Sequence, residues 1–178
     1  QAIGEIKPGT DYNDPKLPAE RKKEKEAALA AYAAYDKIGG ASPEVRKYLN
    51  FANQNGASFE YIGDGFLEGR GSRYHYGYDL YAAAGTPIIV GWDGVVEAIA
   101  NYDADYAAPG ALGQGVWIVS EIDGQKYRIS YGHITADSQV KANRTVKAGE
   151  KIGTISPKLA HPHLDMKWKR ISDEKFVD

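Results

Sequence analysis

The chain has 178 residues, of which 43% are hydrophobic and 26% are charged, a composition typical of a globular domain with a single core. The formal net charge of −2 argues against a nucleic-acid partner, because phosphate binding usually needs a clear basic excess. There are no cysteines, so a disulfide framework is excluded, and any metal must be held by His, Asp or Glu. No apolar run approaches the roughly 18–20 residues that a membrane span requires.

The first third of the chain predicts an arm followed by helices. Residues 1–18 contain three prolines and little periodicity, which indicates an extended arm or linker. Residues 19–38 are rich in strong helix formers and predict a helix. A second, shorter helix is predicted over residues 42–54, with Ser42 as the N-cap and Pro43 at the first helical position.

From about residue 58 the pattern changes to short runs of Val, Ile and Tyr between glycine turns. The stretch "GTPIIVGWDGVVEAIA" predicts a strand, a turn at Asp93-Gly94 and a second strand. The stretch "GVWIVSEIDGQKYRISYGHI" predicts a hairpin around Asp123-Gly124, since Asp-Gly between alternating apolar residues is a strong hairpin signal. We therefore expect an N-terminal arm and helical segment over residues 1–57 and a mainly β, antiparallel domain over residues 58–178.

The stretch "SRYHYGYDLYA" holds one of only four histidines in the chain. His75 is followed four residues later by Asp79, and side chains at positions i and i+4 of a strand share a face. Gly77 between them leaves the space open. This spacing is compatible with half of a metal site, although a lone His and Asp at this distance often occur by chance.

The other three histidines lie far along the chain. The same strand parity places His161, His163 and Asp165 of "HPHLDMKW" on one face. His133 stands near the end of the predicted strand "KYRISYGHI", where a hydrogen-bonded histidine with no metal would be the simplest interpretation. Taken together, however, three strands are able to direct imidazoles and a carboxylate toward one point.

Such a cluster has the ligands of a catalytic zinc site. Zinc in such sites takes three protein ligands and leaves a further position for water. The remaining histidines would then serve as general base and as stabiliser of a tetrahedral oxyanion. The spacing alone does not decide which of the histidines would bind the metal.

Four ordered stretches resemble the LytM/lysostaphin-type zinc metallopeptidases, bacterial enzymes that cut peptide bonds in peptidoglycan. The resemblance runs from about Arg73 to Lys167. It rests on "YHYGYDLYAAAGTPIIVGWDGVVEAI", "GVWIVSEIDGQKYRISYGHI", "VKANRTVKAGEKIGTI" and "HPHLDMK", in that order. It implies a LytM-like antiparallel β-sheet metallopeptidase domain with an N-terminal helical extension.

Carried over to this chain, the resemblance implies one zinc ion held by His75, Asp79 and His163. His133 and His161 would form the catalytic pair, one taking a proton from the attacking water and the other stabilising the oxyanion.

The closing motif also allows a shifted alignment. If Pro162-His163-Leu164 is matched to the family's Pro-His-Leu, Asp165 becomes the third metal ligand. We prefer the first alignment because it gives a role to every histidine, and it leaves Asp165 as a supporting carboxylate.

Two tyrosines are candidates for substrate binding. Tyr74 and Tyr131 are closest in sequence to the predicted site residues and would line a groove or donate to the oxyanion. The simpler interpretation is that they are sheet residues, because tyrosine favours half-buried strands.

The predicted function is a zinc-dependent endopeptidase acting on peptidoglycan peptides. One alternative is a non-catalytic LytM-like module that binds the cell wall or regulates amidases. Another is a latent enzyme in which residues 1–57 cover the groove and Asn50 or Asn53 occupies the open metal position. The chain begins at Gln1 without an initiator methionine, which fits a processed protein, and we expect a periplasmic or secreted location.

Overall fold

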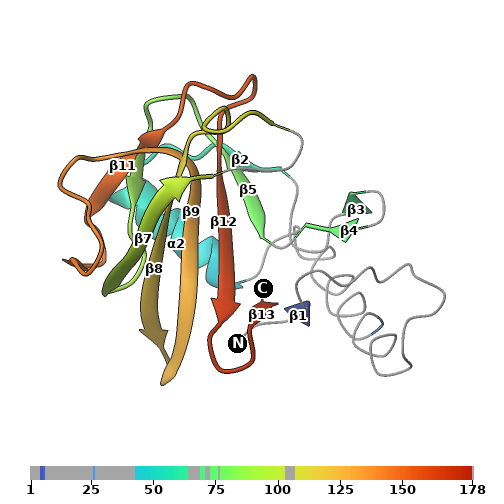
Figure 1. Cartoon of the computed structure of the whole chain (residues 1–178), viewed down its shortest axis with the longest axis vertical. Coiled ribbons are helices and arrows are strands. Elements are labelled where there is room, and N and C mark those ends of the chain that lie inside the picture. The colour runs from blue at the N-terminus through green and yellow to red at the C-terminus, as the bar shows by residue number, and fades with distance from the viewer. Residues whose placement is uncertain are drawn as a thin grey trace.

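The computed structural model describes residues 5–6, 26, 43–63, 69–70, 73–75, 77–102 and 107–177. In these ranges the chain is built mainly from antiparallel strands with one helix, which confirms the predicted fold class (Figure 1). The elements are β1 (Glu5–Ile6), α2 (Pro43–Gln54), β2 (Tyr61–Ile62), β3 (Gly69–Arg70), β4 (Arg73–Tyr74), β5 (Tyr78–Tyr81), β6 (Pro87–Ile89), β7 (Gly94–Asn101), β8 (Gln114–Ile122), β9 (Gln125–Ala136), β10 (Thr145–Val146), β11 (Lys151–Ile155), β12 (His163–Arg170) and β13 (Lys175–Val177).

The long strands lie side by side in the order β12, β9, β8 and β7, as Figure 1 shows. Strand β13 continues the sheet beyond β12, and β10 continues it beyond β7. Strand β5 also pairs with β12, and β11 joins β9 to β6. All of these pairings are antiparallel, so strands distant in sequence, such as β5 and β12, become neighbours.

The hairpin predicted at Asp123-Gly124 is confirmed. Ile122 pairs with Gln125, which leaves a two-residue loop between β8 and β9. Both loop residues have positive φ, 51° for Asp123 and 77° for Gly124. This is the combination that a type I′ turn requires, and its twist matches that of the flanking strands.

The two strands predicted on either side of Asp93-Gly94 are also present, but they do not pair with each other. Strand β6 pairs with β11, whereas β7 pairs with β8 and β10. Gly94 is needed at the start of β7 because a Cβ there would lie 2.6 Å from the carbonyl oxygen of Val119. Close approach of β7 to β8 therefore accounts for this glycine, while longer-range pairing decides the partner of β6.

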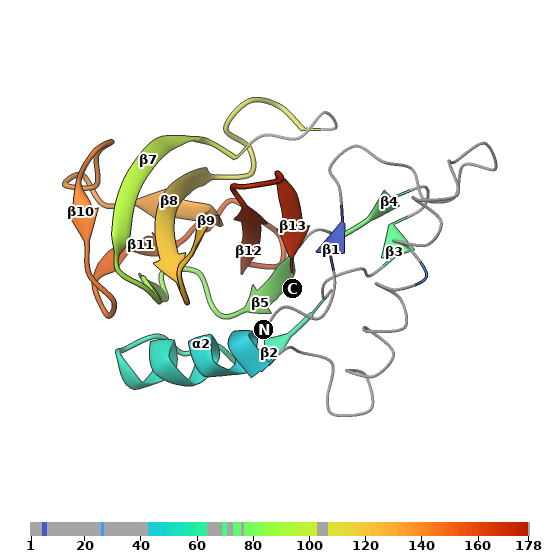
Figure 2. The same ribbon diagram turned by 90° about the horizontal axis from the view of Figure 1, so that it is seen from below.

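Helix α2 begins and ends where the sequence predicts and lies beside the strands (Figure 2). Val45, Tyr48 and Ala52 follow one face of the helix and are at most 2% exposed, within the same core as the sheet. The hydroxyl of Tyr48 donates to the carbonyl of Ile89 at 2.9 Å, and its ring stacks on Trp92. The boundary predicted at residue 57 stays a prediction, but the last helix before it packs into the core of the β domain.

The helix predicted over residues 19–38 lies outside the described residues, except for Glu26, which is helical. In the part of the chain that is described, none of the helices has the length and apolarity needed to cross a membrane.

Candidate metal centre

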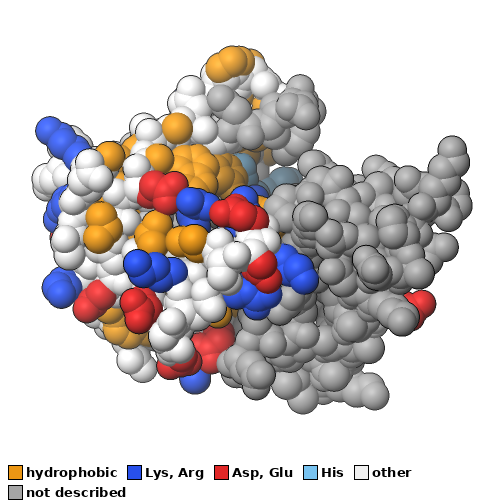
Figure 3. Space-filling model, turned by 60° about the horizontal axis from the view of Figure 1, so that its bottom comes forward, with side chains coloured by type: hydrophobic (Ala, Val, Ile, Leu, Met, Phe, Trp, Pro, Cys, Tyr) orange, Lys and Arg blue, Asp and Glu red, His pale blue; other side chains and the backbone are white. Residues whose placement is uncertain are grey.

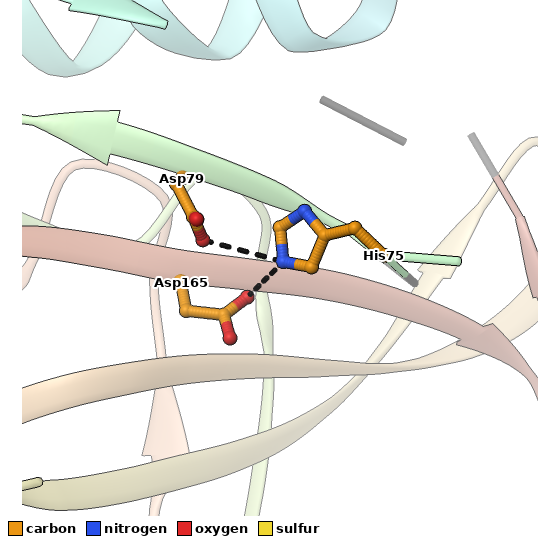
Figure 4. Close-up of side chains that lie close together, drawn as sticks. All are labelled: His75, Asp79 and Asp165. Atoms are coloured by element: carbon orange, nitrogen blue, oxygen red, sulfur yellow. Dashed lines mark ion pairs between the residues drawn. The ribbon is translucent and has the colours of Figure 1, made fainter. Parts of the chain in front are cut away.

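Three buried side chains converge where β5 meets β12. His75 lies just before β5, Asp79 belongs to β5, and Asp165 pairs directly with Asp79 from β12. Nε2 of His75 lies 3.3 Å from Oδ1 of Asp79 and 3.5 Å from Oδ1 of Asp165. Figure 4 shows the imidazole pointing at both carboxylates. Among the described residues, these donors form a group whose ligand atoms all lie within 4.8 Å of one another.

The electrostatics of this group call for a cation. His75, Asp79 and Asp165 are only 3%, 4% and 5% exposed, so water screens their charges poorly. Burial alone would lower the pKa of His75, but the Asp165 and Asp79 carboxylates outweigh it and raise this pKa to about 9. In the absence of metal, the imidazolium therefore supplies positive charge that the two carboxylates require.

The donor set fits a small divalent ion. Ligand atoms placed about 2.0–2.2 Å from a tetrahedral zinc are roughly 3.3–3.6 Å apart, and the two distances from His75 fall in that range. Oδ1 of Asp165 is buried and accepts no hydrogen bond from the described residues. One imidazole nitrogen and two carboxylate oxygens are ligands that zinc accepts.

The other oxygen of Asp165 is tied to the protein. Its Oδ2 accepts hydrogen bonds from Nζ of Lys167 at 2.9 Å and from the hydroxyl of Tyr102 at 3.2 Å. Lys167 also donates to the Tyr102 hydroxyl at 2.6 Å. Burial would raise the pKa of Asp165, but the Lys167 ammonium and then His75 hold it well below its ordinary value. Asp165 is therefore an ionised carboxylate with two differently used oxygens.

Tyr102 reaches Asp165 across a gap in the side-chain layer of the sheet. Gly115 on β8 and Gly132 on β9 are paired neighbours, and Gly132 also pairs with Asp165. A Cβ on Gly132 would lie 2.4 Å from the Tyr102 ring, and one on Gly115 would lie 2.7 Å from it. The two glycines thus make room for the ring. Sequence reasoning missed Tyr102 because it is 63 residues from Asp165 and belongs to no recognisable motif.

His133 is aimed at the site by a β-bulge. Gly115 pairs with Gly132 and Gln114 pairs with Ile134, so His133 is the extra residue in β9. Its φ of 64° is a left-handed conformation that only a few per cent of non-glycine residues adopt. Its Nδ1 lies 2.8 Å from the carbonyl of Leu112, which selects the tautomer that donates there and leaves Nε2 as an acceptor.

Burial lowers the pKa of His133, and the Leu112 carbonyl and Asp165 only partly offset this effect. The ring is 8% exposed and stands edge-on to Tyr102. His133 is therefore a neutral imidazole at neutral pH, with one nitrogen available to take a proton.

His163 is the second imidazole beside the carboxylates. Its Nδ1 lies 2.8 Å from the carbonyl of His161, and its Nε2 lies 3.6 Å from Oδ1 of Asp79. The ring packs on Tyr81 with the centroids 5.0 Å apart, and it meets the His133 ring at 4.9 Å. His133 and His163 thus form an adjacent pair next to the three converging donors.

The structure places the closing motif differently from the preferred sequence alignment. Asp165, and not His163, joins His75 and Asp79 in the described group of three donors. His161 precedes β12 and has an exposed side chain, and its backbone carbonyl orients His163. The reason is register: β12 begins only at His163, and the residue that pairs with Asp79 is Asp165. The geometry accordingly agrees with the shifted alignment.

The two candidate substrate-binding tyrosines are not brought to this group. Tyr131 pairs with the buried Met166 on the core side of the sheet and is fully buried, and its hydroxyl accepts from the Gly91 N–H at 3.3 Å. Tyr131 is therefore a core residue, because its neighbour Gly132 takes the site-facing position opposite Asp165. The side chain of Tyr74 lies outside the described residues.

Asn53, one of the two residues suggested as an internal blocker of the metal position, has a structural role. Its side-chain amide exchanges hydrogen bonds with the backbone of Phe59, at 2.9 and 3.3 Å. These bonds fix the loop that follows α2.

Histidine side chains are visible at the molecular surface beside hydrophobic side chains (Figure 3). His163 is more open than the buried donors: its side chain is 15% exposed, compared with 3% for His75. A ligand arriving from solvent would therefore meet the imidazole of His163 before the buried donors.

Comparisons with known proteins relate the chain to a family of peptidases. Residues 73–178 match the model of peptidase family M23. An uncharacterized metalloprotease of Haemophilus influenzae is 40% identical over 80 residues, which are 45% of this chain and 15% of that protein. Helicobacter pylori Csd3, in an orthorhombic crystal, is 26% identical with a TM-score of 0.50, over 64% of this chain and 30% of that chain.

The catalytic domain of the antimicrobial peptidase lysostaphin from Staphylococcus simulans is 24% identical with a TM-score of 0.49, over 68% of this chain and 84% of that chain. The family model covers more than half of the present chain and includes every residue of the site described above. The chain belongs to peptidase family M23.

Proposed function

We propose that the protein is a zinc-dependent endopeptidase that hydrolyses peptide bonds in bacterial peptidoglycan. The observation that carries this proposal is the convergence of His75, Asp79 and Asp165 beside two further imidazoles. Membership of the M23 family supports peptidase activity. The motifs shared with LytM/lysostaphin-type enzymes support peptidoglycan peptides as the substrate.

The proposed zinc ligands are Nε2 of His75, Oδ1 of Asp79 and Oδ1 of Asp165. When bound, such an ion acts as a Lewis acid that polarises a peptide carbonyl and makes a water molecule more acidic. This assignment replaces His163 by Asp165 in the ligand set, in line with the register of β12 on β5.

His133 and His163 are the proposed catalytic pair. His133 acts as the general base, because it is buried, neutral at neutral pH and held in the tautomer whose Nε2 accepts a proton. His163, with Nε2 facing the Asp79 carboxylate, is the residue proposed to stabilise the developing oxyanion. His161 contributes its carbonyl, which fixes the ring of His163.

We also propose that the protein acts outside the cytoplasmic membrane, as a periplasmic or secreted enzyme. The reason is the proposed substrate, since peptidoglycan lies outside that membrane.

The test is mass-spectrometric analysis of purified peptidoglycan after incubation with the zinc-loaded protein, with chelator-treated protein and with His133→Ala as controls. New cleaved muropeptides are expected only from the zinc-loaded natural protein, and their masses identify the bond. Zinc binding without any release of peptides would contradict the proposal and favour the non-catalytic alternative.

A further inference from the structure

Asp165 offers two oxygens to two different environments. Oδ1 points toward Nε2 of His75 and accepts no hydrogen bond from the described residues. Oδ2 accepts from both Lys167 and Tyr102. A carboxylate near a divalent ion is free to bind through one or both oxygens, and nothing in its own chemistry excludes the second mode. Whether Oδ2 is available to a metal ion therefore depends on its hydrogen bonds to the protein.

The two donors are themselves held in place. The ring of Tyr102 lies on the floor formed by Gly115 and Gly132 and packs against His133 and Trp117. The side chain of Lys167 is 20% exposed, and its ammonium lies 5.0 Å from the centre of the Tyr102 ring. Lysine and tyrosine thus support each other by a hydrogen bond of 2.6 Å.

We infer that Lys167 and Tyr102 are positioning residues that hold Asp165 as a metal ligand through Oδ1 alone. The inference rests on the metal centre proposed above. Lys167 also affects the net charge of the metal centre. Asp79 and Asp165 together would formally neutralise a divalent ion, and the Lys167 ammonium adds one positive charge next to the centre. A centre that keeps positive charge is a stronger Lewis acid.

Loading the protein with Co²⁺ tests the inference through the visible spectrum, which reports coordination number independently of activity. Four-coordinate cobalt absorbs strongly, and a fifth ligand weakens the absorption. Lys167→Met leaves Oδ2 with only the longer hydrogen bond from Tyr102, so we expect this oxygen to reach the metal and the absorption to lose intensity. Lys167→Arg is expected to keep the spectrum of the natural protein, because a guanidinium also donates to Oδ2.

Lys151→Met is the matched control. Lys151 on β11 donates to both carboxylate oxygens of Asp137, at 3.0 and 3.1 Å, and neither residue belongs to the centre. This variant removes the same kind of ion pair and should leave the cobalt spectrum unchanged.

An unchanged cobalt spectrum in Lys167→Met would overturn the inference. Should that variant fail to fold, Tyr102→Phe replaces it, since it removes one donor to Oδ2 without changing charge. A smaller loss of intensity is expected there, and an unchanged spectrum would again overturn the inference. If the natural protein binds no Co²⁺ or Zn²⁺, the metal centre itself is wrong, and this result is distinct from the two others.

Discussion

Asp165 and Asp79 face each other as a directly paired couple in the antiparallel ladder of β12 and β5. Like charges in this arrangement repel each other and destabilise a sheet. The pair is also buried, so solvent does little to reduce the repulsion. Two cationic side chains approach Asp165: His75 lies beside Oδ1, and Lys167 lies beside Oδ2. The buried carboxylate pair is therefore stabilised by positive charge at the position of the proposed metal.

The ligand assignment predicts opposite effects on zinc binding for substitutions of Asp165 and His163. Asp165→Asn should lower zinc affinity by more than about 100-fold, because it removes a ligand rather than a supporting group. His163→Ala should retain zinc and lose peptidase activity. His161→Ala should retain both, since only the backbone carbonyl of His161 is used. Zinc affinity is measured by competition with a chelator of known affinity.

If His163→Ala instead lost zinc while Asp165→Asn retained it, the third ligand would be His163, as the preferred sequence alignment implies.

The proposed role of His133 predicts that two substitutions of this residue have the same effect on activity but different effects on stability. His133→Ala should lower kcat/KM by about 10²–10⁴-fold with zinc still bound, because the general base is lost. His133→Gly should be equally inactive yet more stable than His133→Ala by about 1–2 kcal/mol, since glycine tolerates the φ of 64°. Peptide-release assays and thermal denaturation measure the two effects. Full activity in either variant would exclude His133 as the base.

Zinc affinity should rise with pH. The pKa of His75 is raised to about 9 in the metal-free protein, so binding at neutral pH must displace a proton from Nε2. Below about pH 9 the apparent affinity should fall about tenfold for each pH unit. Conversely, protonated His75 stabilises the metal-free fold below its ordinary pKa, and this contribution is lost as the pH rises through about 9.

Chelator competition at several pH values, together with proton release measured by calorimetry in buffers of different ionisation enthalpy, checks this prediction. An affinity that does not change between about pH 6.5 and 8.5 would contradict it.

The glycine floor under Tyr102 predicts a coupled loss of stability and metal binding. In Gly132→Ala the new Cβ would lie 2.4 Å from the Tyr102 ring, so the ring must move, at a cost of about 1–3 kcal/mol. Because the ring carries a donor to Asp165, zinc affinity should fall as well. Gly124→Ala is the control: its φ of 77° gives strain, but beyond the two adjacent residues no described atom lies within 4 Å of the new Cβ. It should lose stability and keep its zinc affinity.

The packing of α2 predicts where the chain tolerates truncation. Deleting residues 1–57 removes Val45, Tyr48 and Ala52 from the core, and the loss of Tyr48 alone should cost about 3–5 kcal/mol. This approaches the whole stability of a typical domain. We expect this deletion to unfold the protein in thermal denaturation, whereas a deletion that ends before Pro43 keeps α2. The latent-enzyme hypothesis is therefore tested with the shorter deletion, in which increased activity would support it.

Much of the architecture follows from local chemistry that the sequence displays. The hairpin at Asp123-Gly124 forms because two adjacent residues that tolerate positive φ separate two alternating strands. Helix α2 forms because Val45, Tyr48 and Ala52 recur on one helical face. His75 and Asp79 come together because their spacing and the start of β5 place them on the same side.

The proposal of Asp165 as the third donor rests on tertiary structure and not on the sequence. Strand parity places His163 and Asp165 on one face, so the sequence leaves both as candidates. Only the register of β12 on β5, which pairs Asp165 with Asp79, selects between them. Register depends on the packing of the whole sheet and is not a property of the motif.

The positions of Tyr131, His133 and Tyr102 also depend on long-range strand pairing. The sequence determined that the chain is a mainly antiparallel M23 domain rich in possible ligands near three strand ends. The bulge that turns His133 toward the site, the burial of Tyr131 in the core and the glycine floor that carries Tyr102 to Asp165 all arise between strands distant along the chain. Local patterns fix which face a side chain occupies, but only long-range pairing fixes which side chains meet there.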